Sequence, residues 1–444
     1  MIPFLILVVT RLSHPQLFDP DQTPLPVTER TFAARANRHP FILIPGLSGS
    51  GLEVKEKNET KWGRLWIDTL RTLPLVIRGW MKDIKPTFNA TAMTYQSASH
   101  VDVRVKDFGG LQGVNYLDSR LGKLTQAYNP LTKALIEAGY VERKDLYAAP
   151  YDWRLVNVFG NAATAYYEDL KKLVETAFRA CVPLFLIHPR NNNKKVVLIG
   201  HSSGGIVLHR FVTGGVVDQA WIDTYIFAVI TSGAPFGGAP IAYGFSASPR
   251  KWMFLWIGAS TISTLTQDCA CLHWMIPNKN AFNDDYVVGQ LKTSKGDIVR
   301  NITMKNMTWT YDQSGKTGVK TAIQRTRSIT DQPLAQPKVM THVMYSIGIN
   351  TTAGVILNAT NPRWWSDTHS DYYVDGDGTV PTVSLSVPRK WRDTSLVKFH
   401  TYRGCDHMGI ITDAVPIARI LDIIAPATAE EMEYEDSLNP PDDF

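Results

Sequence analysis

Short apolar runs alternate along most of the chain with segments in which apolar residues recur at helical spacing. The runs are rich in β-branched residues and predict buried strands, which cover residues 41–44, 146–149, 196–199, 225–231, 343–347 and 397–402. Leu131, Leu135 and Ile136 predict an amphipathic helix that ends near Gly139, and residues 162–179 predict another helix. This alternation predicts an α/β fold with a mainly parallel central sheet.

The length of 444 residues allows a large core and insertions within one domain. Residues 1–40 are predicted to be a leader and an extended, proline-rich lead-in. One α/β domain is expected over residues 41–425, with insertions at about 52–95 and 236–340. The second insertion has weak periodicity and an apolar, aromatic stretch, which is typical of a lid or cap over an apolar substrate. Residues 426–444 are acidic and predict a disordered tail.

The chain begins with an apolar run, Ile2–Val9, that is too short to span a bilayer. It resembles the apolar part of a signal peptide without the usual positive flank, so a truncated signal, a signal-anchor remnant and an N-terminal strand all remain open. N-x-[ST] sequons favour a glycoprotein of the secretory route, and they occur at Asn58, Asn89, Asn301, Asn306, Asn350 and Asn358. We therefore expect a protein that is secreted or lies in a lysosomal or vacuolar lumen.

Composition narrows the choice of partners only slightly. Hydrophobic residues make up 44% of the chain and charged residues 20%, as in ordinary globular proteins. The formal net charge is +5, and the rest of the chain is more basic than this because the tail contains no Lys or Arg. Such a body favours anionic surfaces, including phospholipid, although a merely solvated basic surface is equally open. The sequence contains no Lys- or Arg-rich run that would indicate binding to nucleic acid.

The four cysteines are Cys181, Cys269, Cys271 and Cys405, and their spacing does not predict a zinc site. One disulfide in an oxidising compartment and buried free thiols both remain open. We expect no metal ion.

The strand at 196–199 leads into Gly200-His201-Ser202-Ser203-Gly204, which fits the G-x-S-x-G pattern and is followed by a predicted helix. A serine on a tight turn between strand and helix exposes its hydroxyl at the edge of the sheet. Ser202 is therefore the candidate nucleophile, and an ordinary Ser/Gly-rich turn is the alternative. The backbone N–H of Ser203 would face a developing oxyanion.

A second oxyanion donor is expected after the strand at 41–44, where a glycine-rich turn begins with Pro45-Gly46-Leu47. A phosphate-binding loop is excluded because Gly51 is followed by Leu52-Glu53 rather than by Lys and Ser or Thr. Leu47 N–H is the candidate donor, and a plain turn is the alternative.

A serine nucleophile needs a base, and that base needs an acid to orient it. Asp375 and Asp377 lie in a glycine-containing segment, and His407 follows the last predicted strand. The order Ser, Asp, His is the one expected when the serine lies on such a turn. A calcium loop that begins at Asp375 is disfavoured because its twelfth position would be Ser386 instead of Glu.

Residues 61–88 combine aromatic, apolar and basic side chains. Trp62, Trp66, Leu75 and Trp80 are candidates for membrane binding, since indole rings and cations suit the headgroup region of a bilayer. A cap whose tryptophans pack inward is equally open.

The motifs HPFILIPG, VNYLDS, AAPYDWRL, LIGHSSGG, SGAPFGG, DGDGTV and DHMGI resemble the lecithin:cholesterol acyltransferase family, over residues 39–423. The resemblance implies an α/β-hydrolase fold with an inserted membrane-binding subdomain and a lid near 242–263, and it implies no cofactor. It implies Ser202 as nucleophile, Asp377 as acid, His407 as base, and oxyanion N–H groups at Leu47 and Ser203.

Two features depart from the pattern of that family. Residues 52–95 contain no cysteine, whereas the family usually closes this segment with a disulfide, and Ser203 stands where an apolar residue is usual.

The resemblance implies a serine-dependent O-acyltransferase or phospholipase A that acts on glycerophospholipids at a membrane or lipoprotein surface. The acyl group would pass from the serine to a sterol, another alcohol or water. A neutral-lipid lipase or other carboxylesterase is the alternative among enzymes. A lipid-binding protein without catalysis is the alternative of another class.

Overall fold

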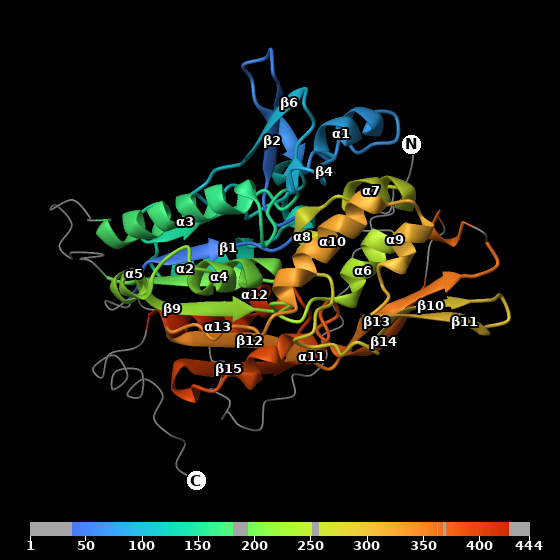
Figure 1. The fold of residues 1–444 in the computed structure, drawn as a ribbon. Coiled ribbons are helices and arrows are strands. Elements are labelled where there is room, and N and C mark those ends of the chain that lie inside the picture. The colour runs from blue at the N-terminus through green and yellow to red at the C-terminus, as the bar shows by residue number, and fades with distance from the viewer. Residues whose placement is uncertain (1–37, 181–193, 251–256, 362, 367–369, 426–444) are drawn as a thin grey trace, which may run out of the picture.

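The computed structural model describes residues 38–180, 194–250, 257–361, 363–366 and 370–425 (Figure 1). The apolar run at Ile2–Val9, Cys181 and the acidic tail therefore lie outside the described residues, and the predictions made for them stay predictions. Among the residues described, no helix is long and apolar enough to cross a membrane.

The centre of the molecule is a parallel sheet. Within the described residues it pairs six strands in the order β15-β12-β9-β8-β1-β7. These strands are β1 (Phe41–Ile44), β7 (Leu146–Ala148), β8 (Val196–His201), β9 (Ile226–Ser232), β12 (Thr341–Ile347) and β15 (Val397–Arg403). All six predicted strands are confirmed, and their carboxyl ends meet at one edge of the sheet.

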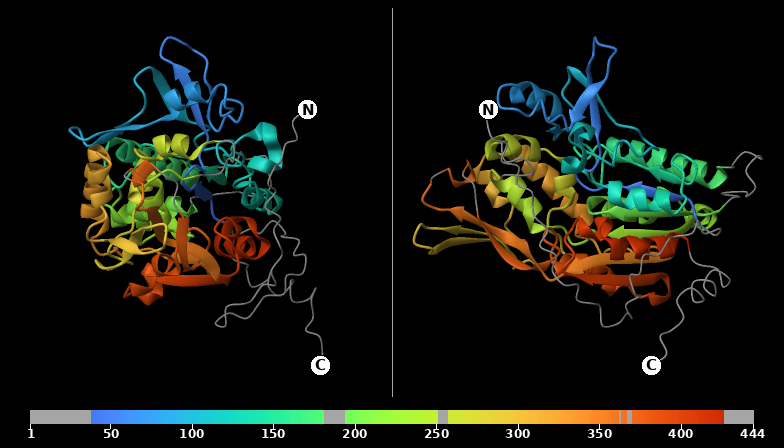
Figure 2. Two further views of the ribbon diagram at one scale, coloured as in Figure 1. Left: turned by 90° about the vertical axis from the view of Figure 1, so that its right-hand side faces the viewer. Right: turned by 180° about the vertical axis from the view of Figure 1, so that it is seen from behind.

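Helices cover both faces of this sheet (Figures 1 and 2). In β1, Ile42 and Ile44 enter one core cluster and Phe41 and Leu43 enter another, so every residue of the strand is buried. The first cluster lies under α3 (Asn161–Arg179), α4 (Ser203–Thr213) and α5 (Gln219–Tyr225), and the second under α2 (Asn129–Glu137), α12 (Gly409–Thr412) and α13 (Ala414–Ile424). A parallel sheet between two helical layers, with a serine turn after β8, is the α/β-hydrolase fold.

A cap lies beside the carboxyl edge of the central sheet. Its own sheet has the order β11-β10-β13-β14 and consists of β10 (Val287–Lys292), β11 (Ile298–Thr303), β13 (Ile349–Asn358) and β14 (Ser370–Gly376). Its helices are α6 (Pro240–Ala247), α7 (Ala259–Thr266), α8 (Ala270–Trp274), α9 (Trp309–Gln313) and α10 (Thr317–Thr330).

The expected end of the cap at residue 340 is too early. Strand β12 belongs to the central sheet, but the chain then passes through Gly348, which has a φ of 92°, directly into β13 of the cap sheet. The sequence pattern could not reveal this, because β12 and β13 form one nearly continuous extended run that serves two sheets.

The insertion after β1 projects from the body (Figure 1). It contains an antiparallel sheet of β3 (Gly63–Trp66), β2 (Leu52–Glu56) and β6 (Val101–Val105), together with α1 (Ile77–Ile84), β4 (Thr87–Asn89) and β5 (Thr94–Gln96). The remaining short elements are η1 (Ser119–Thr125), η2 (Trp364–Ser366), α11 (Thr382–Leu385), η3 (Val387–Lys390) and η4 (Thr394–Leu396).

Candidate active site

Ser202 lies on the sharp turn between β8 and α4, with a φ of 55° and a ψ of −128°. Glycines allow this turn because the backbones come very close. A Cβ added to Gly200 would lie 2.3 Å from the carbonyl oxygen of Gly204, and one added to Gly204 would lie 2.4 Å from that of Ile44. Real Cβ atoms do not approach so closely, so the strained serine turn needs glycine at both positions.

The structure brings Ser202, His407 and Asp377 together. The Oγ atom of Ser202 lies 2.9 Å from Nε2 of His407, and Nδ1 of the same ring lies 2.7 Å from Oδ2 of Asp377. The second carboxylate oxygen of Asp377 accepts the backbone N–H groups of Thr379 and Val380 at 2.9 and 2.7 Å. With its Nδ1–H donated to Asp377, a neutral imidazole turns the lone pair of Nε2 toward the serine hydroxyl, as a general base requires.

The surroundings of His407 favour its charged form. Burial lowers the pKa of this imidazole, but the charge and hydrogen bond of Asp377 outweigh burial, so the pKa is raised above its ordinary value of 6.5. Asp377 thus stabilises the imidazolium that forms when His407 takes a proton from Ser202. The imidazole is free to act as a base only when the pH exceeds this raised pKa.

Asp375, the other candidate acid, faces a different part of the chain. Its carboxylate accepts the backbone N–H of Gly348 at 2.7 Å and the hydroxyl of Thr382 at 2.5 Å. These bonds tie the end of β14 to the junction between the two sheets. Asp377 is the aspartate in contact with His407.

The predicted oxyanion residues flank the nucleophile. Ser203 opens α4, where the first N–H groups of a helix have no partner within it, and its own hydroxyl lies 2.9 Å from that of Tyr151. On the other side, a Cβ added to Gly46 would lie 2.8 Å from Cβ of Ser202, so the Gly46-Leu47 turn touches the nucleophile. The donor roles of Leu47 N–H and Ser203 N–H stay predictions.

Two buried residues for which the sequence pattern predicts no role also belong to this site. The hydroxyl of Tyr128 lies 2.6 Å from N of Gly46 and 3.0 Å from Nδ1 of His201. Nε2 of His201 lies 2.9 Å from the carbonyl oxygen of His407. His201 could have been noticed as the neighbour of Ser202 in the motif, but no motif distinguishes Tyr128.

The membrane-binding prediction is wrong for Trp66 and Trp80. Their exposed fractions are 1% and 0%, and their indole N–H groups donate to the carbonyls of Ser48 at 2.7 Å and Leu65 at 2.9 Å. Indole rings buried with their N–H groups satisfied stabilise the base of the insertion and cannot reach a bilayer. For these two residues the alternative of an inward-packing cap is correct.

The other two candidates for membrane binding lie at the surface. Trp62 is partly exposed, and its ring lies 4.2 Å from the guanidinium carbon of Arg104. Leu75 is 99% exposed, and it lies in a loop whose other apolar side chains are also exposed. We call this set the apolar loop surface, and it consists of Leu70, Leu73, Leu75 and Val76.

Cys269 and Cys271 are buried free thiols, and Cys405 is a partly buried one. In the part of the chain that is described, no group of three or more histidine, cysteine or acidic side chains is arranged to hold a metal ion.

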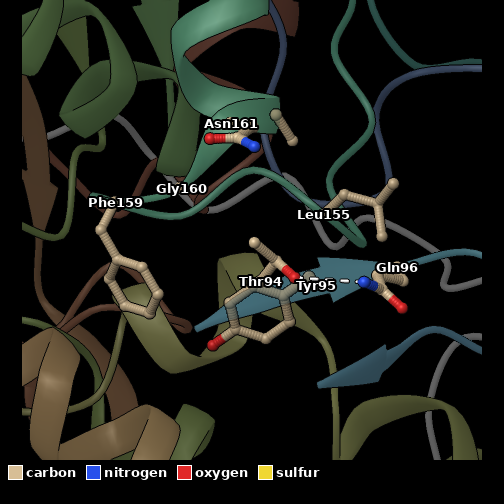
Figure 3. Close-up of a pocket in the computed structure, with 8 residues that line it drawn as sticks. Thr94, Tyr95, Gln96, Leu155, Phe159, Gly160 and Asn161 are labelled. Carbon is tan, nitrogen blue, oxygen red and sulfur yellow. Dashed lines mark hydrogen bonds between the residues drawn. The ribbon is translucent and has the colours of Figure 1, made fainter. Parts of the chain in front are cut away.

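A cavity of about 200 Å³ lies between the hairpin β4–β5 and the start of α3 (Figure 3). Gln96 donates to the hydroxyl of Thr94 at its rim, and Tyr95, Leu155 and Phe159 also line it. None of the triad side chains lines this cavity, so it is not the reaction site.

Comparison with known proteins gives related sequences over most of the chain. A family model described as lecithin:cholesterol acyltransferase matches residues 62–335. The lysosomal phospholipase A and acyltransferase of Rattus norvegicus is 25% identical over 406 residues, which cover 88% of this chain and 92% of that protein. The phosphatidylcholine-sterol acyltransferase of Gallus gallus is 28% identical over 414 residues, which cover 89% of this chain and 91% of that protein.

Among solved structures, one chain in the crystal structure of the Tle4-Tli4 complex is similar, with a TM-score of 0.53 and 15% sequence identity. The similarity covers 88% of this chain and 99% of that chain. At this identity the comparison concerns the fold alone.

We predict that Ser202→Ala lowers turnover of a soluble p-nitrophenyl ester by about 10⁶-fold, because the nucleophile is lost. Ser203→Ala keeps its backbone N–H and loses one hydrogen bond to Tyr151, worth about 1 kcal/mol, so its activity should stay within about tenfold of wild type. Labelling by a fluorophosphonate checks both variants, since only Ser202→Ala should escape the probe. Equal loss in the two variants would contradict the assignment of Ser202.

A second prediction separates the two aspartates. Asp377→Asn should lower turnover by about 10⁴-fold because the imidazole loses its orienting carboxylate, and Asp375→Asn should lower it much less. Turnover of the soluble ester by each purified variant is the measurement. The reverse ranking would move the acid to Asp375.

The pH profile adds a control to this comparison. Since His407 must be neutral to act as a base, kcat/KM of the wild type should fall as the pH drops through a value above 6.5. Removing the carboxylate should move that midpoint to lower pH in Asp377→Asn, whereas Asp375→Asn should leave it unchanged.

Proposed function

Because the chain belongs to the lecithin:cholesterol acyltransferase family, we propose that it is a serine acyltransferase and phospholipase A that cleaves acyl esters of glycerophospholipids. The observation that carries this proposal is the contact of Ser202, His407 and Asp377 within a chain that matches the family model over residues 62–335. That match also confirms the resemblance predicted from the motifs.

The reaction begins when His407 takes the proton of Ser202 as Oγ attacks the ester carbonyl carbon. The carbonyl oxygen becomes an oxyanion, and N–H groups at Leu47 and Ser203 would stabilise it, each contributing about a hundredfold or more in rate. His407 then gives the proton to the departing glycerol oxygen. A lysophospholipid leaves, and the acyl group stays on Ser202.

The second half of the reaction decides the product. His407 takes a proton from an acceptor hydroxyl, whose oxygen attacks the acyl-serine, and then returns that proton to Oγ of Ser202. With water as acceptor the product is a fatty acid, and with a sterol or another alcohol it is a new ester. We propose that the enzyme transfers to both kinds of acceptor, because one acyl-serine serves water and alcohols alike.

Liposomes of phosphatidylcholine with a labelled acyl chain, with and without a sterol, test the function directly. We expect lysophospholipid together with labelled fatty acid or labelled ester, and none of these products from Ser202→Ala. Hydrolysis of triacylglycerol without action on phosphatidylcholine would favour a neutral-lipid lipase. Lipid binding without turnover would favour a lipid-binding protein.

We also propose that the apolar loop surface docks the enzyme on phospholipid. Exposed apolar side chains gather at Leu70, Leu73, Leu75 and Val76, and the neighbouring helix α1 carries the exposed cations Arg78 and Lys82. Apolar side chains that enter the acyl boundary beside cations at the headgroups are the usual means of peripheral binding.

Replacing Leu73 and Leu75 by Ser should lower activity on liposomes by roughly a hundredfold or more, since each buried leucine contributes about 1.5–3 kcal/mol. Activity on a soluble p-nitrophenyl ester should change little, because that substrate reaches Ser202 by diffusion. Anionic lipid should partly rescue the liposome activity, and added salt should reverse the rescue.

A matched control exists on the cap sheet, where Ile298 and Val299 are 51% and 59% exposed. The double variant Ile298→Ser and Val299→Ser should behave as wild type on both substrates. If the Leu73 and Leu75 variant loses both activities equally, the loop is part of the structural cap and docking is disproved. Trp80 is unsuitable for this test because it is buried.

We propose, finally, that the protein enters the secretory route and carries N-linked glycans. Five of the six sequon asparagines are exposed, namely Asn58, Asn89, Asn301, Asn350 and Asn358. Asn306 is half-buried and accepts the backbone N–H of Thr303 at 2.7 Å. These positions make the exposed sequons accessible to a glycosyltransferase.

Expression of the full chain in a eukaryotic cell should give a protein whose mobility on a gel increases after treatment with a glycosidase. Asn58→Gln should remove one step of this shift, since Asn58 lies at the exposed end of the β2–β3 hairpin. A full-length protein with unchanged mobility would contradict secretory entry.

A further inference from the structure

A buried chain of hydrogen bonds links the two sides of the catalytic serine. It runs from N of Gly46 to the hydroxyl of Tyr128 (2.6 Å), from there to Nδ1 of His201 (3.0 Å), and from Nε2 of His201 to the carbonyl oxygen of His407 (2.9 Å). Tyr128 and His201 are each 2% exposed, so water does not compete for these bonds. The two ends of the chain are the turn next to Ser202 and the backbone of its base.

Chemistry fixes the direction of every bond in this chain. The N–H of Gly46 can only donate, so the oxygen of Tyr128 accepts it. The carbonyl of His407 can only accept, so Nε2 of His201 carries a hydrogen. A neutral imidazole has a single N–H, so Nδ1 of His201 accepts the hydroxyl proton of Tyr128. All four groups are satisfied in one arrangement.

His201 keeps this arrangement while its neighbour changes charge. Burial, and then the charge of His407, lower the pKa of His201 to about 3. The ring of His201 therefore stays neutral when His407 becomes an imidazolium, although the ring centroids are only 5.0 Å apart.

Among the described strands, β1 and β15 do not pair with each other, so strand pairing does not directly join the two ends of this hydrogen-bond chain. The Gly46 turn follows β1 and His407 follows β15, and strands β8, β9 and β12 separate β1 from β15 in the sheet. His201, the last residue of β8, lies between these two ends. The ring of Tyr128 also packs on the turn itself, since a Cβ added to Gly49 would lie 3.0 Å from its Cε2 atom.

We propose that Tyr128 and His201 are positioning residues that hold the oxyanion turn at Gly46-Leu47 and the base His407 in one geometry around Ser202. This proposal rests on the proposed function, because it concerns the geometry of that serine reaction. Neither side chain needs to touch the substrate. A shift of about 1 Å in an oxyanion donor or a base lowers the rate about a hundredfold. Side chains that hold both groups in place therefore have a large effect on the rate.

The first test is Tyr128→Phe, which removes the hydroxyl and keeps the ring. We expect kcat on a soluble p-nitrophenyl ester to fall by roughly ten- to a hundredfold while KM stays within about threefold, since ground-state binding is unchanged. The pH midpoint of the reaction should not move, because the contact of His407 with Asp377 is intact. Rates are expressed per active site titrated with a fluorophosphonate, so that loss of folded protein does not count as loss of catalysis.

Tyr140→Phe is the matched control. Tyr140 is also 2% exposed, and its hydroxyl donates to the carbonyl of His39 at 3.0 Å, away from the triad. This variant should lose stability comparable to that lost in Tyr128→Phe, yet keep the kcat of wild type.

The second test is His201→Gln, whose amide N–H can still reach the carbonyl of His407 but which leaves no ring nitrogen for Tyr128. His201→Leu has a similar size and no donor, so it should lose more kcat than His201→Gln. If one chain carries the effect, the double variant Tyr128→Phe, His201→Gln should be no slower than the slower single variant. If Tyr128→Phe does not fold, the comparison of His201→Gln with His201→Leu is sufficient to test the proposal.

The proposal would be overturned if Tyr128→Phe had the same kcat as Tyr140→Phe. It would also be overturned if the loss of kcat in the double variant equalled the product of the losses in the two single variants. A loss confined to the number of titratable sites would also overturn it, since the role would then be structural. A wild-type protein that hydrolyses the soluble ester but no phospholipid would instead contradict the proposed function and leave this test valid.

Discussion

The close approach of three backbone segments around Ser202 is the constraint on which the rest of the site depends. Side chains at Gly200 or Gly204 would overlap the neighbouring backbone, and one at Gly46 would lie 2.8 Å from Cβ of the serine. Strand β8, helix α4 and the turn after β1 therefore meet without any intervening side chain. This contact presents the Ser202 hydroxyl at the sheet edge and puts a backbone turn beside the carbonyl that it would attack.

Two neighbouring histidines, His201 and His407, have different roles at this contact, and their environments determine which of them acts as the base. The charge and hydrogen bond of Asp377 raise the pKa of His407 despite its burial. For His201, burial and the charge of His407 outweigh the weaker effect of Asp377, so its pKa is lowered. When the pKa values of two neighbouring titratable groups are shifted in opposite directions, the shifts indicate which group transfers protons in the reaction. His407 is thus suited to be the base, and His201 is suited to be a neutral spacer that donates one hydrogen bond and accepts another.

The sequence predicted what depends on short-range pattern. Buried strands such as 41–44 are predicted by their β-branched, apolar composition. Ser202, Asp377 and His407 are predicted by their motifs and by their order along the sequence. It did not predict which tryptophans of the insertion point inward, because Trp66 and Trp80 differ from exposed residues only through contacts with distant segments. The role of Tyr128 was hidden for the same reason, since its partners lie 82 and 73 positions away.

Residues 52–95 contain no cysteine, and polar contacts, several of them buried, join this insertion to the body of the molecule. Arg154 is fully buried and joins Asp152 to the carbonyl of Ile84, while Asp118 accepts bonds from Arg64, Arg120 and Thr69 beneath the apolar loop surface.

Burial alone would raise the pKa of Asp118, but bonds from Arg120 and Thr69 outweigh it, so the pKa lies well below its ordinary value. A carboxylate with a depressed pKa contributes its full stability above the unfolded value of about 4 and loses it only at lower pH. The loop that we propose to dock on lipid therefore keeps its support in a neutral fluid and in an acidic lumen alike.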